Sequence, residues 1–239
     1  MDLLMELNLT KTPINPTIIQ GFPGFGLVGT ITTEYLIQKL ECELIGKYWF
    51  EKLPATIAIH DEKVVHPIGI YYNEKNNIVI VHAITASMGI EWEISRLITE
   101  LAERLQAKEI ISLEGVGGTE VSDKPNSFFY TNDPARKEVL AKLNTTPLKE
   151  GIIVGVTSAL LLNCTRPVTT LLAETHSELP DSTAAAKLIE LLDSYLGLSI
   201  DTKPLLDTAK KFEEKINSIM QKSTDIHSKL QKKQLSYVG

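Results

Sequence analysis

The chain has 239 residues, 43% of them hydrophobic and 23% charged, which is the composition of a globular protein large enough to bury a sizeable core. Its 24 Lys and Arg residues against 30 Asp and Glu give a formal net charge of −6, which argues against a broad nucleic-acid-binding surface. The sequence shows no signal-peptide pattern and no apolar run near the ~20 residues of a membrane helix, and Cys42 and Cys164 lack metal-type spacing. These features predict a cytoplasmic protein with free thiols.

Short apolar runs, glycine turns and helical patterns alternate through the first half of the chain. We expect a strand, a glycine-rich turn and a helix in "PTIIQGFPGFGLVGTITTEYLIQKL", where apolar residues fall near one helical face. Strands are expected in "CELIGKYWF" and "PATIAIH", and a hairpin in "KVVHPIGIYY" and "NNIVIVHAI", whose β-branched runs flank "NEKNN". An apolar stripe predicts a helix in "GIEWEISRLITELAERLQA", and "KEIISLEGVGG" predicts a buried strand that runs into a second glycine turn.

The second half continues the alternation. A polar loop with an apolar patch at Phe128–Tyr130 precedes a helix that should begin near Asp133, with Pro134 in its first turn. The segments "GIIVGVTSALLLNC" and "RPVTTLLAET" are apolar and should be mostly buried, and "PDSTAAAKLIELLDSYLGL" predicts a helix capped by Asp181 or Ser182 that ends near Gly197. This order of elements favours a mostly parallel sheet with helices on both faces and one antiparallel hairpin.

The last segment has a different pattern. Its apolar or small positions are spaced alternately by four and three residues, and they are Leu205, Ala209, Phe212, Ile216, Ile219, Ser223, Ile226 and Leu230. This heptad seam predicts a long helix over residues 204–234 that forms a coiled coil within or between chains. The predicted self-association residues are Phe212, Ile216, Ile219, Ile226 and Leu230. A long amphipathic helix that lies on its own domain is the alternative.

Residues 235–239 form a predicted flexible tail that is unusually apolar for a chain end. It contains Leu235, Tyr237 and Val238, and it finishes at Gly239. Such a tail either packs back on its own fold, frays as an ordinary terminus, or enters a pocket of another protein.

The first glycine turn offers a candidate site. Gly24, Gly26 and Gly29 in "GFGLVG" follow a predicted strand and precede a predicted helix, which is the order of a dinucleotide-binding turn, and Glu41 or Glu43 stands near the position of the ribose-binding acid. The same pattern is common wherever a strand leads into a helix. A nucleoside- or dinucleotide-binding enzyme that uses the Gly21–Gly29 turn is therefore kept as the alternative function.

Other candidate chemistry is weak. In "EGVGGTEVS", Glu114 and Glu120 flank a second glycine turn that could line a cleft, although a tight connecting turn is the simpler interpretation. The five histidines are not spaced like the ligands of known metal sites; they are His60, His66, His82, His176 and His227. A Ser158–His176–Asp181 triple lacks the G-x-S-x-G elbow of a hydrolase, and the phosphate-binding P-loop motif is absent from the sequence. We therefore expect no catalytic residues, no metal and no cofactor.

Four segments in order, "GFPGFGLVG", "SLEGVGG", "GVTSALLLN" and "PDSTAAAKLIELL", followed by the link "LSIDTKPLLDTA" and a long helix, resemble the proteasome assembly chaperone family in its archaeal form. The resemblance covers residues 15–235. It implies a three-layer α/β/α sandwich, similar to nucleoside phosphorylases, over residues 1–200. It also implies a non-enzymatic, homo-oligomeric chaperone that binds proteasome α-subunits.

In this family, some members carry a C-terminal hydrophobic–Tyr–any-residue tail. The resemblance implies that such a tail enters a pocket between adjacent α-subunits, where the terminal carboxylate pairs with a lysine. The tail of this chain departs from that pattern, because Tyr237 is third from the end and Ser236 occupies the hydrophobic position. We predict that the protein is an ATP-independent chaperone that binds α-subunits or the core particle through Leu235, Tyr237, Val238 and Gly239. It either assists assembly of the α-ring or acts on the mature proteasome.

Overall fold

The computed structural model describes residues 7–50, 52–53, 55–60, 62–85, 88–117, 125–175, 179–201 and 203–204. The predicted coiled-coil helix, apart from its first residue Pro204, and the predicted tail lie outside the described residues. The predictions for Phe212, Ile216, Ile219, Ile226 and Leu230, and for the residues of the tail, therefore stay predictions.

The centre of the molecule is an eight-stranded mixed sheet in the order β2-β5-β6-β1-β7-β10-β8-β9. In chain order the strands are β1 (Thr17–Gly21), β2 (Glu43–Tyr48), β3 (Ala58–His60), β4 (Lys63–Val65), β5 (Ile68–Asn73), β6 (Ile78–Ala83), β7 (Glu109–Gly117), β8 (Ser127–Thr131), β9 (Thr146–Pro147) and β10 (Val168–Thr175). The four central strands β6, β1, β7 and β10 are parallel, whereas β5 and β8 run antiparallel to their central neighbours. The predicted mixed, mostly parallel sheet is confirmed.

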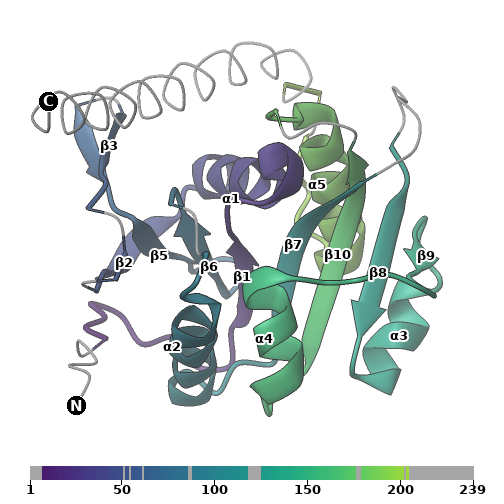
Figure 1. Ribbon diagram of the computed structural model, residues 1–239, viewed down its shortest axis with the longest axis horizontal. Coiled ribbons are helices and arrows are strands. Elements are labelled where there is room, and N and C mark those ends of the chain that lie inside the picture. Colours follow the sequence, from purple (N-terminus) through teal and green to yellow (C-terminus); the bar gives the residue numbers. More distant parts are fainter. Residues whose placement is uncertain are drawn as a thin grey trace, which may run out of the picture.

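Helices cover both faces of this sheet (Figure 1). They are the short 3-10 turn η1 (Phe25–Leu27), α1 (Val28–Lys39), α2 (Glu91–Arg104), α3 (Pro134–Leu140), α4 (Gly155–Asn163) and α5 (Ser182–Leu196). Helix α1 packs beside α5 on one face, and α2 packs beside α4 on the other. The arrangement is an α/β/α sandwich.

Two apolar cores lie between the sheet and its two helical layers, one on each face. On β1, Ile18 belongs to the core shared with α2 and α4, while its neighbour Ile19 belongs to the core shared with α1 and α5. The same division holds on β7 for Ile110 and Ile111. Because successive side chains of a strand point to opposite faces, a strand covered on both faces needs apolar side chains at neighbouring positions, which explains the paired isoleucines of these two strands.

The amino-terminal segment covers the outer edge of the sheet. Leu9 bridges Gly46 of the edge strand β2, and the Thr10 amide donates to the Ile45 carbonyl over 2.8 Å. The segment is held from the other side by Arg104, whose Nη1 donates to the Leu7 carbonyl over 2.6 Å. A sheet edge that would otherwise present free backbone groups is thus paired along part of its length.

Helix boundaries agree with the predicted caps. The Asp133 side chain accepts from the Arg136 amide over 3.0 Å at the start of α3, and Asp181 accepts from the Ala184 amide over 2.9 Å at the start of α5. Of the two predicted caps of α5, Asp181 is therefore the one used. Gly197 ends α5 with φ of 68°, in the left-handed region that favours glycine.

Three predictions about local structure need correction. The run "KVVHPIGIYY" is divided between β4 and β5 at Pro67, because proline has no N–H to donate to a strand ladder. Only β5 belongs to the hairpin with β6, whereas β4 pairs with β3 in a separate hairpin. The Phe128–Tyr130 patch is the centre of strand β8 rather than part of a loop. The expectation that "GIIVGVTSALLLNC" is mostly buried is wrong for Ile152, Val154 and Leu162, which are 92%, 73% and 71% exposed.

Candidate functional site

The carboxyl edge of strands β1 and β7 is where this topology places a crevice. After β1 the chain enters α1 on one face of the sheet, and after β7 it reaches α4 on the opposite face. Adjacent parallel strands whose connections leave in opposite directions form a topological switch point, which is where open α/β sheets bind ligands. Both predicted glycine turns, the one after β1 and the one at the end of β7, lie at this point.

The glycines of the first turn are required for close packing between backbones. A Cβ on Gly29 would meet the carbonyl of Leu113 on β7, and a Cβ on Gly115 of β7 would meet the carbonyl of Phe25. Gly26 has φ of 64°, and a Cβ there would lie 2.8 Å from Thr175 Oγ1. The turn and the start of α1 are therefore pressed onto β7 and β10, which only residues without a side chain allow.

This packing gives the predicted dinucleotide turn a different role. In a dinucleotide site the second glycine leaves room for a pyrophosphate, but here Thr175 occupies that side of Gly26. The Oε2 atom of Glu114 lies 3.4 Å from the position of a Cβ on Gly24, so a carboxyl group faces the turn. Residues 17–33 contain no Lys or Arg. The nearby carboxyl group and the lack of Lys and Arg in this segment disfavour the binding of a phosphate.

Glu114 ends a chain of hydrogen-bonded polar side chains beneath α4. Thr157 Oγ1 donates to Glu114 Oε1 and also contacts Ser112 Oγ, and Gln20 Nε2 donates to Ser112 Oγ and, over 3.2 Å, to Thr157 Oγ1. Gln20, Ser112 and Thr157 are fully buried. Among the described residues, Gln20 Oε1 has no hydrogen-bond partner. These contacts fix Thr157 and, through it, the direction of the Glu114 carboxyl group.

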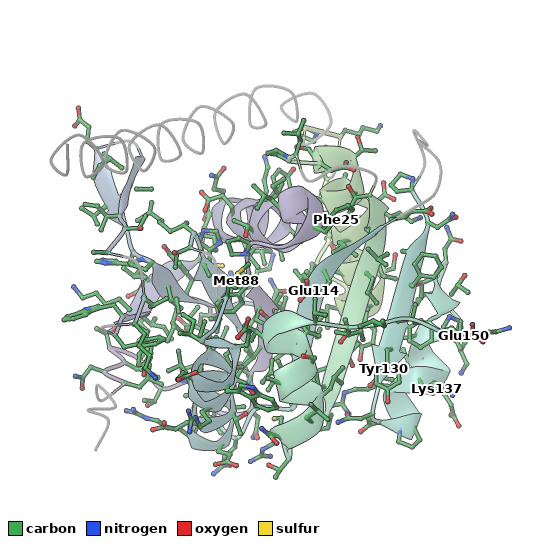
Figure 2. All side chains as sticks on the ribbon, viewed as in Figure 1. Phe25, Met88, Glu114, Tyr130, Lys137 and Glu150 are labelled. Carbon is green, nitrogen blue, oxygen red and sulfur yellow. The ribbon has the colours of Figure 1, made fainter. Side chains whose placement is uncertain are left out.

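The environment of Glu114 changes its acidity. Its side chain keeps partial contact with solvent, but its carboxyl group is densely surrounded by protein. Burial raises the pKa of Glu114 to about 7, and the hydrogen bond from Thr157 opposes the shift only in part. Figure 2 shows Glu114 between α1 and α4, with Phe25 and Met88 nearby in this view. The sequence indicates Glu114 only as a residue beside a turn, because its partner Thr157 belongs to a helix that the apolar segment "GIIVGVTSALLLNC" does not reveal.

A second buried polar group lies on the opposite face of the sheet. His82 of β6 is buried, with Nδ1 2.9 Å from Thr33 Oγ1 and Nε2 3.2 Å from Glu34 Oε2 on α1. Burial lowers the pKa of His82, and Glu34 opposes this shift. The ring therefore joins α1 to the sheet as a buried group, which is a structural role, and its Nε2 makes no regular hydrogen bond to any described residue.

The other residues weighed as candidate chemistry do not come together among the described residues. Ser158 donates to the Gly155 carbonyl of its own helix over 2.9 Å, and Asp181 caps α5 on the opposite face of the sheet while it accepts from Thr175 over 2.7 Å. His66 is partly exposed, and His176, His227 and Glu120 lie outside the described residues. Within the described ranges, no group of three or more His, Cys, Asp or Glu side chains could hold a metal ion. Burial raises the pKa of the Cys42 thiol to about 12, which makes it unreactive.

The amino edge of the sheet carries a structural network. Arg136 Nε donates to Glu109 Oε2 over 2.9 Å, and Arg136 Nη1 donates to Asp133 Oδ2 over 2.8 Å. Tyr195 of α5 donates to the same Glu109 carboxylate over 3.1 Å. Because Glu109 is buried at the start of β7, these contacts tie α3 and α5 to the sheet.

A shallow pocket of about 270 Å³ also lies at the amino edge, between the end of α1, the β5–β6 turn and the segment after α5. Its lining includes Lys39 and Lys75 but also Glu41 and Asp201, so it has no single charge preference. Lys39 is already placed over the ring of Tyr35, 5.5 Å from its centre.

Comparisons with known proteins give one consistent result. A family model described as the PAC2 family matches residues 18–220. The uncharacterized protein MJ0106 of Methanocaldococcus jannaschii is 25% identical over 229 residues, which cover 94% of this chain and 93% of that protein. The crystal structure of PbaA from Pyrococcus furiosus, an archaeal homolog of proteasome-assembly chaperone, has a TM-score of 0.83 and 30% identity, with 93% of this chain and 99% of that chain covered.

A second protein of Pyrococcus furiosus has the same fold. PbaB, described as an archaeal proteasome activator, matches with a TM-score of 0.73 and 22% identity over 90% of this chain and 98% of its own. No helix among the described residues is both long and apolar enough to span a membrane.

Proposed function

The chain belongs to the PAC2 family, and from this premise we propose that it acts as an ATP-independent, non-enzymatic chaperone in proteasome assembly. In this proposal it binds proteasome α-subunits or the core particle, and it works as a homo-oligomer in the cytoplasm. The observation that carries the proposal is the likeness to PbaA, because it extends over nearly the full length of both chains at 30% identity.

The polar groups at the carboxyl edge support a binding role rather than catalysis. Gln20, Ser112 and Thr157 are fully buried and hydrogen-bonded to one another, so they serve to hold Glu114. A general base needs to reach the proton that it removes, and a nucleophile needs an adjacent base. The buried Gln20, Ser112 and Thr157 meet neither requirement. The nucleotide-binding enzyme, kept as the alternative on the sequence pattern, loses its main support, since the Gly21–Gly29 turn packs against its own sheet.

Residues 235–239 supply the docking element in this proposal. Tyr237 would provide an aromatic anchor with a polar tip, and the carboxylate of Gly239 would pair with a lysine of the α-subunit pocket. The predicted helix over residues 204–234 would carry the tail away from the globular domain, and several tails in one oligomer would add avidity. The ring of Tyr237 and the terminal carboxylate must be satisfied together, so the spacing between them is decisive.

Co-purification with proteasome α-subunits tests the proposal. The full-length chain, a chain lacking residues 236–239, Tyr237→Ala, and a chain with one glycine added after Gly239 are compared under the same conditions. Ser236→Ala is the matched control, because it keeps the ring and the carboxylate in place. We expect the full-length and Ser236→Ala proteins to retain α-subunits and the other three to lose most of them.

The outcomes separate the tail from the wider function. Equal recovery of α-subunits by the truncated chain would exclude the tail mechanism and leave the chaperone role to the folded domain. Absence of α-subunits with every form of the protein, including the full-length chain, would refute the proposed function itself. Circular dichroism of each variant checks that the fold is unchanged.

A further inference from the structure

We propose that the crevice beside Glu114 is a docking site for a lysine or arginine side chain of a partner protein. The site is separate from the predicted tail, and the inference does not depend on the role in proteasome assembly. The crevice is defined by Glu114 on β7, Thr157 on α4 and the turn at Gly24.

The geometry of the carboxyl group supports this assignment. Oε1 of Glu114 accepts a hydrogen bond from Thr157, whereas Oε2 accepts none from any described residue and faces the glycine turn. A Cβ on Gly24 would lie 3.4 Å from Oε2, so this oxygen lies next to a position that carries no side chain. An ionised carboxylate can accept several hydrogen bonds, and the part of the chain that the structure describes supplies a donor to only one of the two oxygens of Glu114.

Among the described residues, the elements around Glu114 provide no positive charge for its carboxyl group. Helix α4, strand β1 and the turn at residues 22–27 contain no charged residue. On β10, Glu174 is acidic and already accepts from Asn126 over 2.8 Å, and at the start of α2 the Glu93 carboxylate is paired with Lys52 over 2.9 Å. A densely surrounded carboxylate without a cation is costly to ionise, and its pKa of about 7 reflects this cost. An ammonium or guanidinium group inserted next to Glu114 would remove this cost of ionisation.

Exposed apolar side chains at the same edge indicate a protein rather than a small ion. Phe25, Met88 and Val154 are 38%, 90% and 73% exposed. Phe25 follows Gly24, Val154 caps the helix that carries Thr157, and Met88 follows β6 on the same edge of the sheet. The methylene groups of Lys or Arg pack on apolar surface while the charged end reaches a carboxylate, and an apolar surround excludes water from such a contact. A small amine would leave these side chains uncovered.

The test uses the full chain and short peptides as probes. Acetyl-Leu-Arg-Leu-amide is titrated into isotope-labelled protein, and acetyl-Leu-citrulline-Leu-amide, which has the same shape without the charge, serves as the paired probe. Nuclear magnetic resonance follows the amides of Gly24, Gly115 and Thr157 and the side-chain carboxyl carbon of Glu114. The arginine peptide should shift these signals and lower the pKa of Glu114 by about one unit or more, as expected when a cation approaches within a few Å. The citrulline peptide should do neither.

Two variants complete the experiment. Glu114→Gln keeps the side-chain shape and should weaken binding of the arginine peptide at least tenfold, while Glu174→Gln removes another carboxylate from the same edge and should leave binding unchanged. Circular dichroism confirms that both variants are folded. Equal shifts with the two peptides, no shift with either, or unchanged binding by Glu114→Gln would each overturn the assignment. If spermidine produced the same shifts at the same concentration, the site would be assigned to a free polyamine and the assignment to a protein partner would be wrong.

Discussion

Replacing Gly29 by alanine should destabilise the protein, although the same change inside a helix normally stabilises it. Gly29 is the second residue of α1, and a Cβ there would meet the Leu113 carbonyl. Leu113 lies in β7, which pairs with β1 on one side and β10 on the other, so its carbonyl cannot move aside as the end of a side chain could. Overpacking of this kind costs about 1–3 kcal/mol. Glycine to alanine in a helix otherwise contributes roughly 0.5–1 kcal/mol of stability.

The expected net result is a loss of about 1–2 kcal/mol in the free energy of unfolding. Urea denaturation followed by tryptophan fluorescence measures it, since Trp49 and Trp92 are each about half exposed and will report the change in environment. Gln38→Ala is the matched control, because Gln38 is exposed on the same helix and its replacement should change stability by less than about 0.5 kcal/mol. A Gly29→Ala protein as stable as the wild type, or more stable, would contradict the claim that this glycine is needed for backbone packing.

Three further predictions concern stability. The pKa of Glu114 is raised in the fold from 4.5 to about 7, so the folded state binds the extra proton; the contribution of Glu114 to stability should be complete below pH 4.5 and fall by about 3 kcal/mol as the pH rises through 7, and Glu114→Gln should remove this decline from the urea-midpoint profile. Asp181→Ala removes the cap of α5 and the acceptor of the Thr175 hydroxyl, and a loss of about 1–2 kcal/mol in urea denaturation is expected; a loss no larger than that of an exposed substitution would argue against the cap. Gly26→Ala should lower the thermal midpoint by several degrees, since its φ of 64° costs about 1–2 kcal/mol for any other residue and Thr175 leaves no room; a midpoint equal to that of the wild type would show that the turn relaxes.

Most helices and strands could be predicted because their signals are local. The Asp181 cap and the apolar stripe of α2 depend on residues within a few positions of each other, so periodicity and capping rules suffice. Strand β8 was missed because the apolar core of "SFFYT" is short and flanked by polar residues, and its pairing with β10 joins segments about 40 positions apart along the chain.

The candidate site could not be predicted for a related reason. Glu114 and Thr157 are 43 positions apart, and they meet only because α4 crosses the end of β7. The glycine spacing of the first turn was visible in the sequence, but the spacing does not reveal whether a ligand or the protein itself fills the space next to each glycine. Here Thr175 and the Leu113 carbonyl fill it.

The pairing of Leu9 and Thr10 with β2 limits how copies of this protein can join. Growth of one continuous ladder from subunit to subunit needs a long unpaired strand at each end, and here one end, β2, is already paired in part by the chain itself while the other, β9, is only two residues long. The eight-stranded sheet therefore offers little free backbone for joining subunits, so contacts between copies around this sheet would depend mainly on side chains of its helices and loops. Such an assembly would depend on the identity of those residues more than on backbone geometry, and it could change its number of subunits through few substitutions.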